Sequence, residues 1–546
     1  MLPTTLLFAL AALVSPVLND TADELPDDVR FALEAGGTAS IRANVRFLSN
    51  DLLEGRSPGT RGGELAARYL ATRMETLGLE PAGTDGGWFQ KVPLVGMQTD
   101  FGASAAEMSI GDRVFPLTWL DEFVGSDLTL APSSAVDAEM VYVGYGIHAP
   151  EQGWNDYDGI DVRGKVVLAC VNDPPSDDPS FFGGPGLTYA GRWTYKYEEA
   201  ARRGAVGCVL IHRDSMAGYG WTVVRNSWGR EKPYVDERGA DGHRLSLASW
   251  ISESRITEIL KEAGHDVAAM IDAAGRRGFE ATPLGVRIKA TLRSNVRTLD
   301  TSNVVGLLRG TTRADEYVVY SSHFDHLGKT SEMQGDFVYN GSVDNASGCG
   351  AVLEVARMFS RLRTRPERSI LFLFVTAEEG GLRGSQYWCM NPTVPIEAVA
   401  ANINLDSTVV NGEPLDYEPL GYDRSTLQAP MERVARLFDV RLLPDSRPEQ
   451  GIFYRSDHFS FAKAGIPAVY LKHGNRFADK SEGWGSAEKE SYRKERYHRV
   501  TDEFDPRWDF VGTLKTARIA FALGAIVAAD PKMPAYRQDD EFYRAR

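Results

Sequence analysis

The chain has 546 residues, which is too long for one compact core, so about two or three domains are expected. Its composition, 43% hydrophobic and 25% charged, is ordinary for a globular protein and excludes a mostly disordered chain. The formal net charge is −15 at pH 7 and no long basic run occurs, so neither nucleic acid nor an anionic membrane surface is an expected partner.

The first segment, 1–18, is largely apolar and leads into the polar pair Asn19-Asp20. This pattern resembles the core of a secretory signal peptide, so the sequence predicts a secreted or periplasmic protein. The segment departs from the usual pattern because no Lys or Arg precedes the apolar stretch and no clear cleavage site follows it. A short hydrophobic N-terminal helix is the alternative.

Residues 20–127 are predicted to begin an α/β domain. A loop rich in Gly and Pro, 51–62, precedes a run whose apolar residues recur at helical spacing and which ends at Gly78. The predicted buried face of this helix consists of Leu65, Tyr69, Leu70, Met74 and Leu77.

The residue pattern changes over 128–275, where short β-rich runs are separated by a long loop rich in Gly, Pro, Trp and Tyr. These runs predict a smaller, β-rich domain inserted into the first one. They are Met140–Tyr145, Lys165–Val171 and Val206–His212. Cys170 and Cys208 each lie in such a run, so a disulfide and two buried free thiols are both compatible with the sequence.

From 285 to 546, strand-like runs alternate with helical ones, which implies a mostly parallel sheet with helices on both faces. The predicted fold class is therefore α/β, with the domain begun by 20–127 completed by 285–546. The apolar run Ile519–Ala529 is too short to span a bilayer and predicts a buried helix, so no membrane-spanning segment is expected in the mature chain.

Histidines and carboxylates stand at or just past the ends of apolar strand-like runs in this C-terminal part. In an open α/β sheet, ligands gather at the carboxyl ends of the strands, so these side chains are predicted to meet in a two-metal site. Nitrogen and oxygen donors without cysteine suit zinc, manganese or cobalt in a hydrolytic enzyme. The predicted metal ligands are His323, Asp344, Glu379, Asp406 and His498.

Asp344 is the candidate for the ligand shared by both ions, because a carboxylate has two oxygens. It also precedes a helix, so taken alone it is equally well interpreted as an N-terminal cap. Asp325, two residues after His323, is predicted to accept the second ring proton of that histidine. His498 stands in a polar loop, and by itself it would be interpreted as a surface residue.

Glu378 and Glu379 are adjacent carboxylates, whose mutual repulsion is a cost unless a cation offsets it. Neighbouring side chains point in different directions, so Glu379 is predicted to be a ligand and Glu378 the general base. An exposed acidic turn before Gly380-Gly381 is the competing interpretation.

Six segments together resemble the co-catalytic di-zinc exopeptidase family of aminopeptidase Y, glutamate carboxypeptidase and the secreted bacterial aminopeptidases. Both the order and the spacing of the segments agree with that family. They are SSHFDHLG (321–328), NGSVDNASG (340–348), TAEEGGLRGS (376–385), NINLD (402–406), SDHFSFAKAGIPA (456–468) and YHRVTDEFDP (497–506). The inserted segment is similar to a protease-associated (PA) domain, with weaker motifs.

The resemblance implies a role for each ligand. His323 and Asp406 would hold one zinc ion. Glu379 and His498 would hold the other, and Asp344 would bridge the pair. Every ligand position is kept, which separates this chain from relatives, such as the transferrin receptor, that have lost catalysis.

The resemblance also assigns the remaining site residues. Glu378 matches the general base, and Asp325 fits the outer-shell carboxylate. Tyr497 matches a tyrosine that helps to stabilise the oxyanion of the tetrahedral intermediate in some relatives.

The predicted function is a two-zinc aminopeptidase that removes N-terminal residues from peptides. A carboxypeptidase or dipeptidase on the same scaffold is the alternative, because no decisive charged cluster for either substrate terminus is visible. A glutaminyl cyclase is disfavoured because that chemistry uses one zinc. A non-catalytic binding protein, in which the PA-like domain recruits partners, is the hypothesis from a different class. The sequence does not indicate the oligomeric state.

Overall fold

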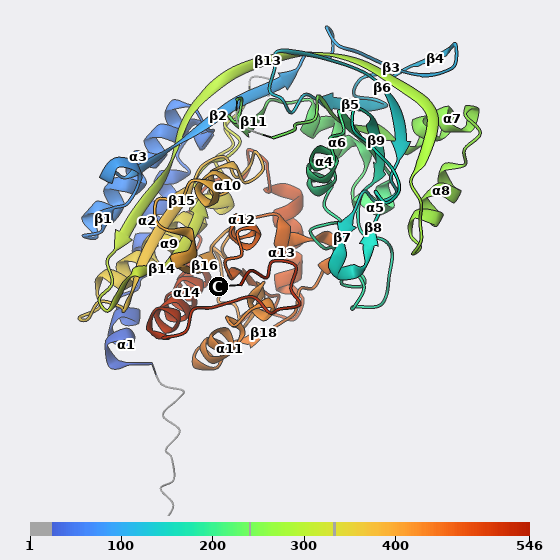
Figure 1. Cartoon of the computed structure of the whole chain (residues 1–546). Coiled ribbons are helices and arrows are strands. Elements are labelled where there is room, and N and C mark those ends of the chain that lie inside the picture. The colour runs from blue at the N-terminus through green and yellow to red at the C-terminus, as the bar shows by residue number, and fades with distance from the viewer. Residues whose placement is uncertain (1–24, 240–241, 331–334, 546) are drawn as a thin grey trace, which may run out of the picture.

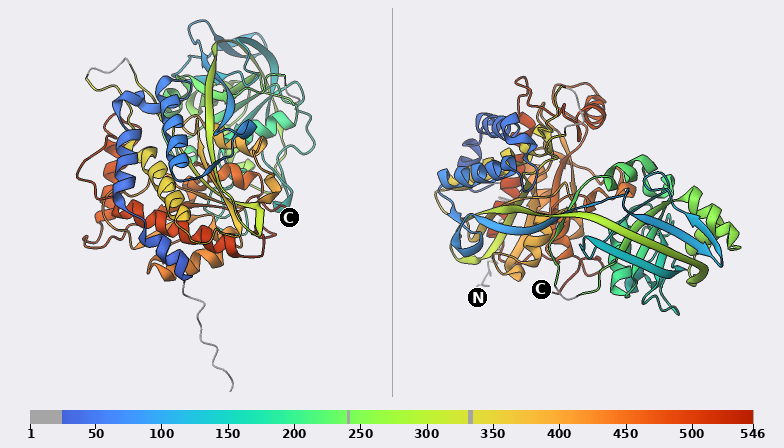
Figure 2. Two further views of the ribbon diagram at one scale, coloured as in Figure 1. Left: turned by 90° about the vertical axis from the view of Figure 1, so that its left-hand side faces the viewer. Right: turned by 90° about the horizontal axis from the view of Figure 1, so that it is seen from above.

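The computed structural model describes residues 25–239, 242–330 and 335–545, so the predicted signal peptide, 1–18, lies outside the described residues. Two sheets share one long strand, β13 (Thr282–Leu308), which arches over the molecule (Figure 1). Residues 282–293 of this strand pair in one sheet and residues 294–308 pair in the other. Figure 2 shows the two sheets side by side along it.

The central sheet is built around four parallel strands, in the order β15 (Arg368–Val375), β14 (Arg313–His323), β16 (Val399–Asn404) and β19 (Ala468–His473). Every residue of β15 is buried, because a parallel strand covered on both faces needs a continuous apolar run. Mostly antiparallel pairings add further strands on either side. These are β1 (Glu80–Pro81), β2 (Phe89–Thr99), β11 (Lys232–Val235), β17 (Asp416–Leu420) and β18 (Arg441–Leu442). The predicted α/β class is confirmed.

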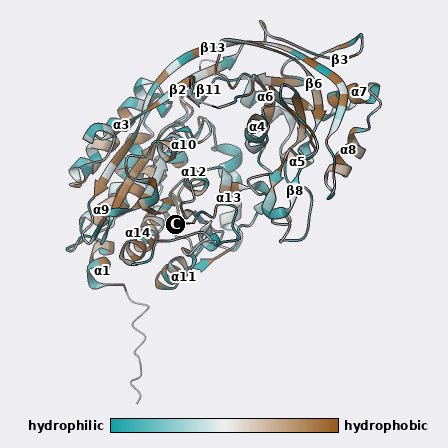
Figure 3. Ribbon diagram, in the orientation of Figure 1, coloured by the Kyte–Doolittle hydropathy of each residue, from teal (hydrophilic) through white to brown (hydrophobic). Residues whose placement is uncertain are grey.

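Helices cover both faces of the central sheet, and the apolar colouring of Figure 3 is concentrated on its strands. One face packs on α2 (Thr38–Leu48), α3 (Arg61–Thr76), α9 (Gly348–Ser360), α11 (Gln428–Leu437) and α14 (Val511–Ala529). The other face packs on α10 (Arg383–Met390) and α12 (His458–Lys463). Two further helices are α1 (Asp27–Glu34), where Ala32 is buried, and α13 (Trp484–Glu495), where Gly485 is buried.

The predicted entry helix is present as α3, but its buried face differs from the expected one. Leu65 is 38% exposed, and the small residues Ala66, Ala67 and Ala71 are buried instead beside Leu70 and Met74. Alanines allow the helix to approach the sheet closely, which a count of large apolar residues does not reveal.

The predicted buried helix at Ile519–Ala529 is confirmed as the second half of α14. Among the described residues, α14 is the one helix whose length and apolar composition would allow a membrane crossing, and 72% of its apolar window is buried inside the protein. It lies close to β14, where Tyr320 donates a hydrogen bond to the Ala520 carbonyl at 2.8 Å. A Cβ on Gly524 would stand 1.8 Å from the Tyr320 hydroxyl, so this contact requires glycine.

The second sheet, called here the inserted sheet, contains the strands that the β-rich runs predicted. Its strand order is β5 (Phe123–Ser126), β12 (Leu247–Ser252), β10 (Gly207–His212), β9 (Val166–Cys170), β6 (Ser133–Tyr142), β13, β3 (Ala105–Ile110) and β4 (Arg113–Pro116). Its helices are α4 (Trp193–Arg202), α5 (Asp214–Ala217), α6 (Trp221–Trp228), α7 (Glu253–Glu262) and α8 (Val267–Ala274), and β7 (His148–Ala149) pairs with β8 (Trp154–Asn155) beside it.

The predicted limits of the inserted domain, 128 and 275, remain a prediction. β3 lies before residue 128 and the first half of β13 lies after residue 275, yet both pair within the inserted sheet. Cys170 and Cys208 form no disulfide, because both are buried free thiols. They do not face each other, since Cys170 pairs with Ile211 and Cys208 with Val167.

Candidate metal centre

The predicted ligands come together at one edge of the central sheet. His323 ends β14, Glu379 follows β15, and Asp406 follows β16. Because these strands are parallel neighbours, their carboxyl ends deliver the three side chains to the same place. Asp344 reaches it from a short turn before α9, and His498 from the loop after α13.

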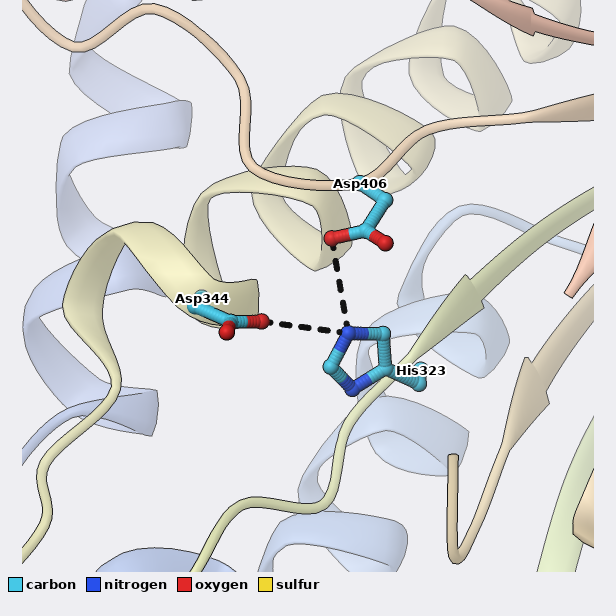
Figure 4. A group of neighbouring side chains, drawn as sticks. All are labelled: His323, Asp344 and Asp406. Atoms are coloured by element: carbon cyan, nitrogen blue, oxygen red, sulfur yellow. Dashed lines mark ion pairs between the residues drawn. The ribbon is translucent and has the colours of Figure 1, made fainter. Parts of the chain in front are cut away.

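The first group is His323, Asp344 and Asp406 (Figure 4). His323 Nε2 lies 3.3 Å from Asp344 Oδ1 and 3.4 Å from Asp406 Oδ1. A charge-assisted hydrogen bond would be shorter, at about 2.7–2.9 Å. Two atoms bound tetrahedrally to zinc at about 2.0–2.2 Å are separated by roughly 3.3 Å. The spacing and the buried, unpartnered Nε2 of His323 therefore fit a cation between the three groups.

The second group uses the other oxygen of the same aspartate. His498 Nε2 lies 3.3 Å from Asp344 Oδ2 and 3.0 Å from Glu379 Oε2. Asp344 thus turns one oxygen toward His323 and the other toward His498. This divided carboxylate fits a pair of neighbouring ions that share one ligand.

Electrostatics also favour a cation at this edge. Burial alone would lower the pKa of His498, but Glu379 and Asp344 raise it to about 11. Burial and Asp344 act to raise the pKa of Glu379, yet His498 and His326 lower it to about 2. These opposite shifts reflect the attraction between the histidines and the carboxylates. An imidazole nitrogen must be unprotonated to act as a ligand, so metal binding at this cluster would release protons.

Glu378 lies beside the cluster without joining either group. Its Oε2 is 3.9 Å from His323 Nε2, and its side chain is 11% exposed. Burial raises the pKa of the Glu378 carboxyl well above its ordinary value, and the carboxylates of Asp457 and Asp406 act in the same direction. A carboxylate with a raised pKa next to a ligand group can accept and return a proton.

Tyr497 stands at the open side of the cluster. Its side chain is 45% exposed, whereas His323 is 1% exposed. Its ring stacks on the ring of His498, with the centroids 3.9 Å apart and the planes 21° from parallel. The phenol therefore borders the solvent side of the site, next to a predicted ligand.

Asp325 makes contacts other than the predicted one. Its Oδ1 is 3.8 Å from His323 Nδ1, too far for a hydrogen bond, and the nearer partner of that nitrogen is the Asp325 carbonyl at 3.2 Å. The carboxylate instead accepts the backbone N–H groups of Glu378 at 3.0 Å and Glu379 at 3.4 Å. It thereby fixes the turn that carries both glutamates.

Several supporting residues were not found by sequence reasoning. The Ser456 hydroxyl donates to Asp406 Oδ2 at 2.7 Å, and the Asp502 carboxylate accepts the Asp344 N–H at 3.2 Å. Arg56 is buried and donates to the carbonyls of Phe324 and Gly341, at 2.7 and 3.0 Å. Ser456 and Asp502 lie in segments that carry the family resemblance, so they were open to prediction, but their contacts were not.

Comparison with known proteins agrees with this geometry. Residues 303–522 match the model of peptidase family M28, and all the predicted ligands fall inside that segment. Residues 303–522 therefore form a segment of the peptidase M28 type. The chain is 32% identical over 146 residues to aminopeptidase NAALADL1 of Mus musculus, covering 25% of this chain and 18% of that protein. It is 27% identical over 302 residues to the probable glutamate carboxypeptidase AMP1 of Arabidopsis thaliana, covering 51% and 39%.

The alignments with these two relatives span only 18% and 39% of their lengths. Among solved structures, the aminopeptidase from Aneurinibacillus sp. strain AM-1 is similar at 19% identity with a TM-score of 0.49, covering 92% of this chain and 97% of that one.

Proposed function

We propose that this protein is a zinc-dependent exopeptidase of the aminopeptidase type, with two ions per chain, acting on peptides. The observation that carries the proposal is the divided carboxylate of Asp344, at 3.3 Å from His323 on one side and 3.3 Å from His498 on the other. The family match and the name of the NAALADL1 relative support a peptidase of this type.

Each ligand role follows from its place in the cluster. His323 and Asp406 would hold one ion. Glu379 and His498 would hold the other, and Asp344 would bridge them. When bound, two zinc ions supply Lewis acidity that activates water and polarises a peptide carbonyl.

The remaining steps belong to side chains of this protein. Glu378 accepts a proton from the attacking water and returns it to the departing amine. Tyr497, on the open side of the cluster, donates a hydrogen bond to the oxygen that becomes negative in the tetrahedral transition state. Asp325 keeps Glu378 in place through the backbone hydrogen bond at 3.0 Å.

A carboxypeptidase or dipeptidase is the second candidate function. The similarity to the probable glutamate carboxypeptidase over 51% of this chain favours it. The two functions need opposite groups near the site, an acidic group for a free amine or a basic group for a terminal carboxylate. Substrate tests therefore separate them.

The experiment is a panel of matched peptides assayed with and without a chelator. One set has a free amino terminus and an amidated carboxyl terminus, and the other has an acetylated amino terminus and a free carboxyl terminus. We expect hydrolysis of the first set only, abolished by chelator and restored by zinc, with about two zinc ions per chain by elemental analysis. Hydrolysis of the second set alone would establish the carboxypeptidase, and an inactive metal-free protein would leave only a binding function.

Export and the nature of the insert are part of the same proposal. The apolar segment 1–18 supports a secreted or periplasmic location. The separate hydrophobic cores of the inserted sheet support a folding unit of the kind expected for a PA domain. Mass spectrometry of the N-terminus after expression in a bacterial host tests the export, since cleavage near residue 18 is expected.

A further inference from the structure

His326 touches a predicted ligand yet has no role in the proposed chemistry. Its Nδ1 lies 2.6 Å from Glu379 Oε1, and its side chain is 0% exposed. The other oxygen of that carboxylate, Oε2, faces His498 Nε2 at 3.0 Å. The two oxygens of Glu379 are therefore divided between His326 and the second ligand group.

We propose that His326 is a positioning residue for the ion held by Glu379 and His498. It donates its Nδ1–H to Oε1 and so directs Oε2 of Glu379 toward that ion. The inference rests on the proposed function, because it presupposes the ion. Outer-shell hydrogen bonds of this kind orient metal ligands, and losing one lowers metal affinity by roughly 10- to 100-fold.

His326, Asp344 and Glu379 also form a group that could hold an ion, and His326 Nε2 is buried without a hydrogen-bond partner among the described residues. The contact of Nδ1 with Glu379 favours the positioning role instead. The His326 Nδ1 is 2.6 Å from Glu379, which is hydrogen-bonding distance. The atoms that face each other across the two ion positions are 3.0–3.4 Å apart. The His326 ring also meets the His498 ring edge to face, with centroids 5.9 Å apart.

The protein is built to hold the His326 ring in this place. Gly341 has a φ of 55°, and a Cβ there would stand 2.2 Å from the Asp344 carbonyl oxygen and 2.6 Å from the His326 ring. The Gly341 carbonyl accepts a hydrogen bond from the buried Arg56 at 3.0 Å, which anchors the loop against the ring. Space for His326 therefore depends on a residue without a side chain.

The short segment 323–326 then serves the cluster at three points. His323 faces the first ion position, Asp325 holds the backbone of Glu379 at 3.4 Å, and His326 holds its carboxylate. The backbone and the side chain of one ligand are thus fixed by residues that are adjacent to each other in the sequence.

The test measures zinc affinity on the full chain, stripped of metal and titrated with zinc against a competing chelator. His326→Phe keeps a planar ring and removes the donor. We expect one ion to bind as in the unmodified protein and the other about 10- to 100-fold more weakly. His326→Asn, whose amide nitrogen stands near the position of Nδ1, should restore most of the lost affinity.

The matched control is His212→Phe in the inserted sheet. His212 is also buried, at 3% exposure, and its Nε2 lies 3.0 Å from Asp214 Oδ1. This control should leave both zinc affinities unchanged. If His326→Phe does not fold, His326→Ala gives the same comparison.

Two results would overturn the inference: two ions bound by the His326 variant with unmodified affinity, or both ions weakened equally. A different result would contradict the proposed function instead, namely fewer than two ions bound by the unmodified chain. The two failures are therefore distinguishable.

Discussion

The metal centre and the interior of the inserted sheet both bury charged groups, but they balance them differently. In the inserted sheet, the fully buried Lys196 acts on two buried carboxylates, Asp156 and Asp173. Each carboxylate also has protein donors. Asp156 accepts from Ile147 N–H at 2.9 Å, and Asp173 from Thr188 N–H at 2.7 Å.

In the candidate metal centre, the described residues form no Lys or Arg ion pair with Asp344, Glu379 or Asp406, whose partners are histidines instead. Arg56, which follows α2 in the sequence, is buried, and the hydrogen bonds of its side chain go to backbone carbonyls. Buried acids alone therefore do not mark a catalytic site. What distinguishes the candidate metal centre is that its carboxylates face histidines at separations that suit a metal ion.

The largest expected effect is on catalysis, at Glu378 beside the two predicted ligand groups. Replacing Glu378 by Gln keeps its size and removes the base, so kcat should fall by about 10²- to 10⁴-fold. The zinc content should stay unchanged, because Glu378 is in neither ligand group. Elemental analysis and peptide hydrolysis measure the two quantities on one sample. A variant that remains fully active would refute the base assignment.

The next effect concerns the shared ligand. Asp344→Ala should lose both ions, because one carboxylate serves both groups. Zinc at about 1,000 times its dissociation constant stabilises a fold by about 4 kcal/mol, so chelator should lower the melting temperature of the unmodified protein. The melting temperature of the variant should not respond to chelator. A chelator-sensitive Asp344→Ala protein would contradict the bridging role.

Part of the candidate metal centre could be predicted from the sequence, and part of it could not. The strand-end positions of His323, Glu379 and Asp406 were predictable, because an apolar run followed by a polar residue marks the edge of a parallel sheet. The hydrogen bond between His326 and Glu379 was not, because it depends on the path of the loop through Gly341. The small buried face of α3 and the pairing of Lys196 depend likewise on tertiary packing.

A smaller effect, on folding stability, is expected in the inserted sheet. Burial raises the pKa of Asp156 to about 7 and that of Asp173 to about 6, and the charge of Lys196 opposes both shifts. Lys196→Met should therefore destabilise the fold most near pH 7, where the carboxylates are ionised and Lys196, whose own pKa is lowered by burial to about 8, is still protonated. Chelator should not change this loss.

The sign of the pH dependence follows from those raised pKa values. A carboxyl whose pKa is higher in the folded than in the unfolded state stabilises the fold at low pH, and this contribution is lost as pH rises through the folded value. The cost of Lys196→Met should therefore grow between about pH 5 and pH 7. Denaturant unfolding of both proteins across that range measures it. A loss that is constant with pH would argue against the pairing.

The smallest effect is expected where the glutamate turn meets β11, a strand of the central sheet. Gly380 directly follows the predicted ligand Glu379, and a Cβ there would stand 2.0 Å from Cγ of Pro233 in β11. Arg383, at the start of α10, donates to the Pro233 carbonyl at 3.1 Å, so the β11 strand is held against the glutamate turn. Gly380→Ala should displace this turn and lower kcat about tenfold, or ~1.4 kcal/mol, without loss of zinc.

A second substitution decides whether that loss comes from the contact with β11. Pro233→Gly removes the ring that the new methyl group would meet, so the double variant should recover most of the activity lost in Gly380→Ala. Gly220→Ala is the control, because the nearest atom to its Cβ is 3.7 Å away, and it should retain full activity. If the double variant were no more active than Gly380→Ala, the turn would be independent of β11.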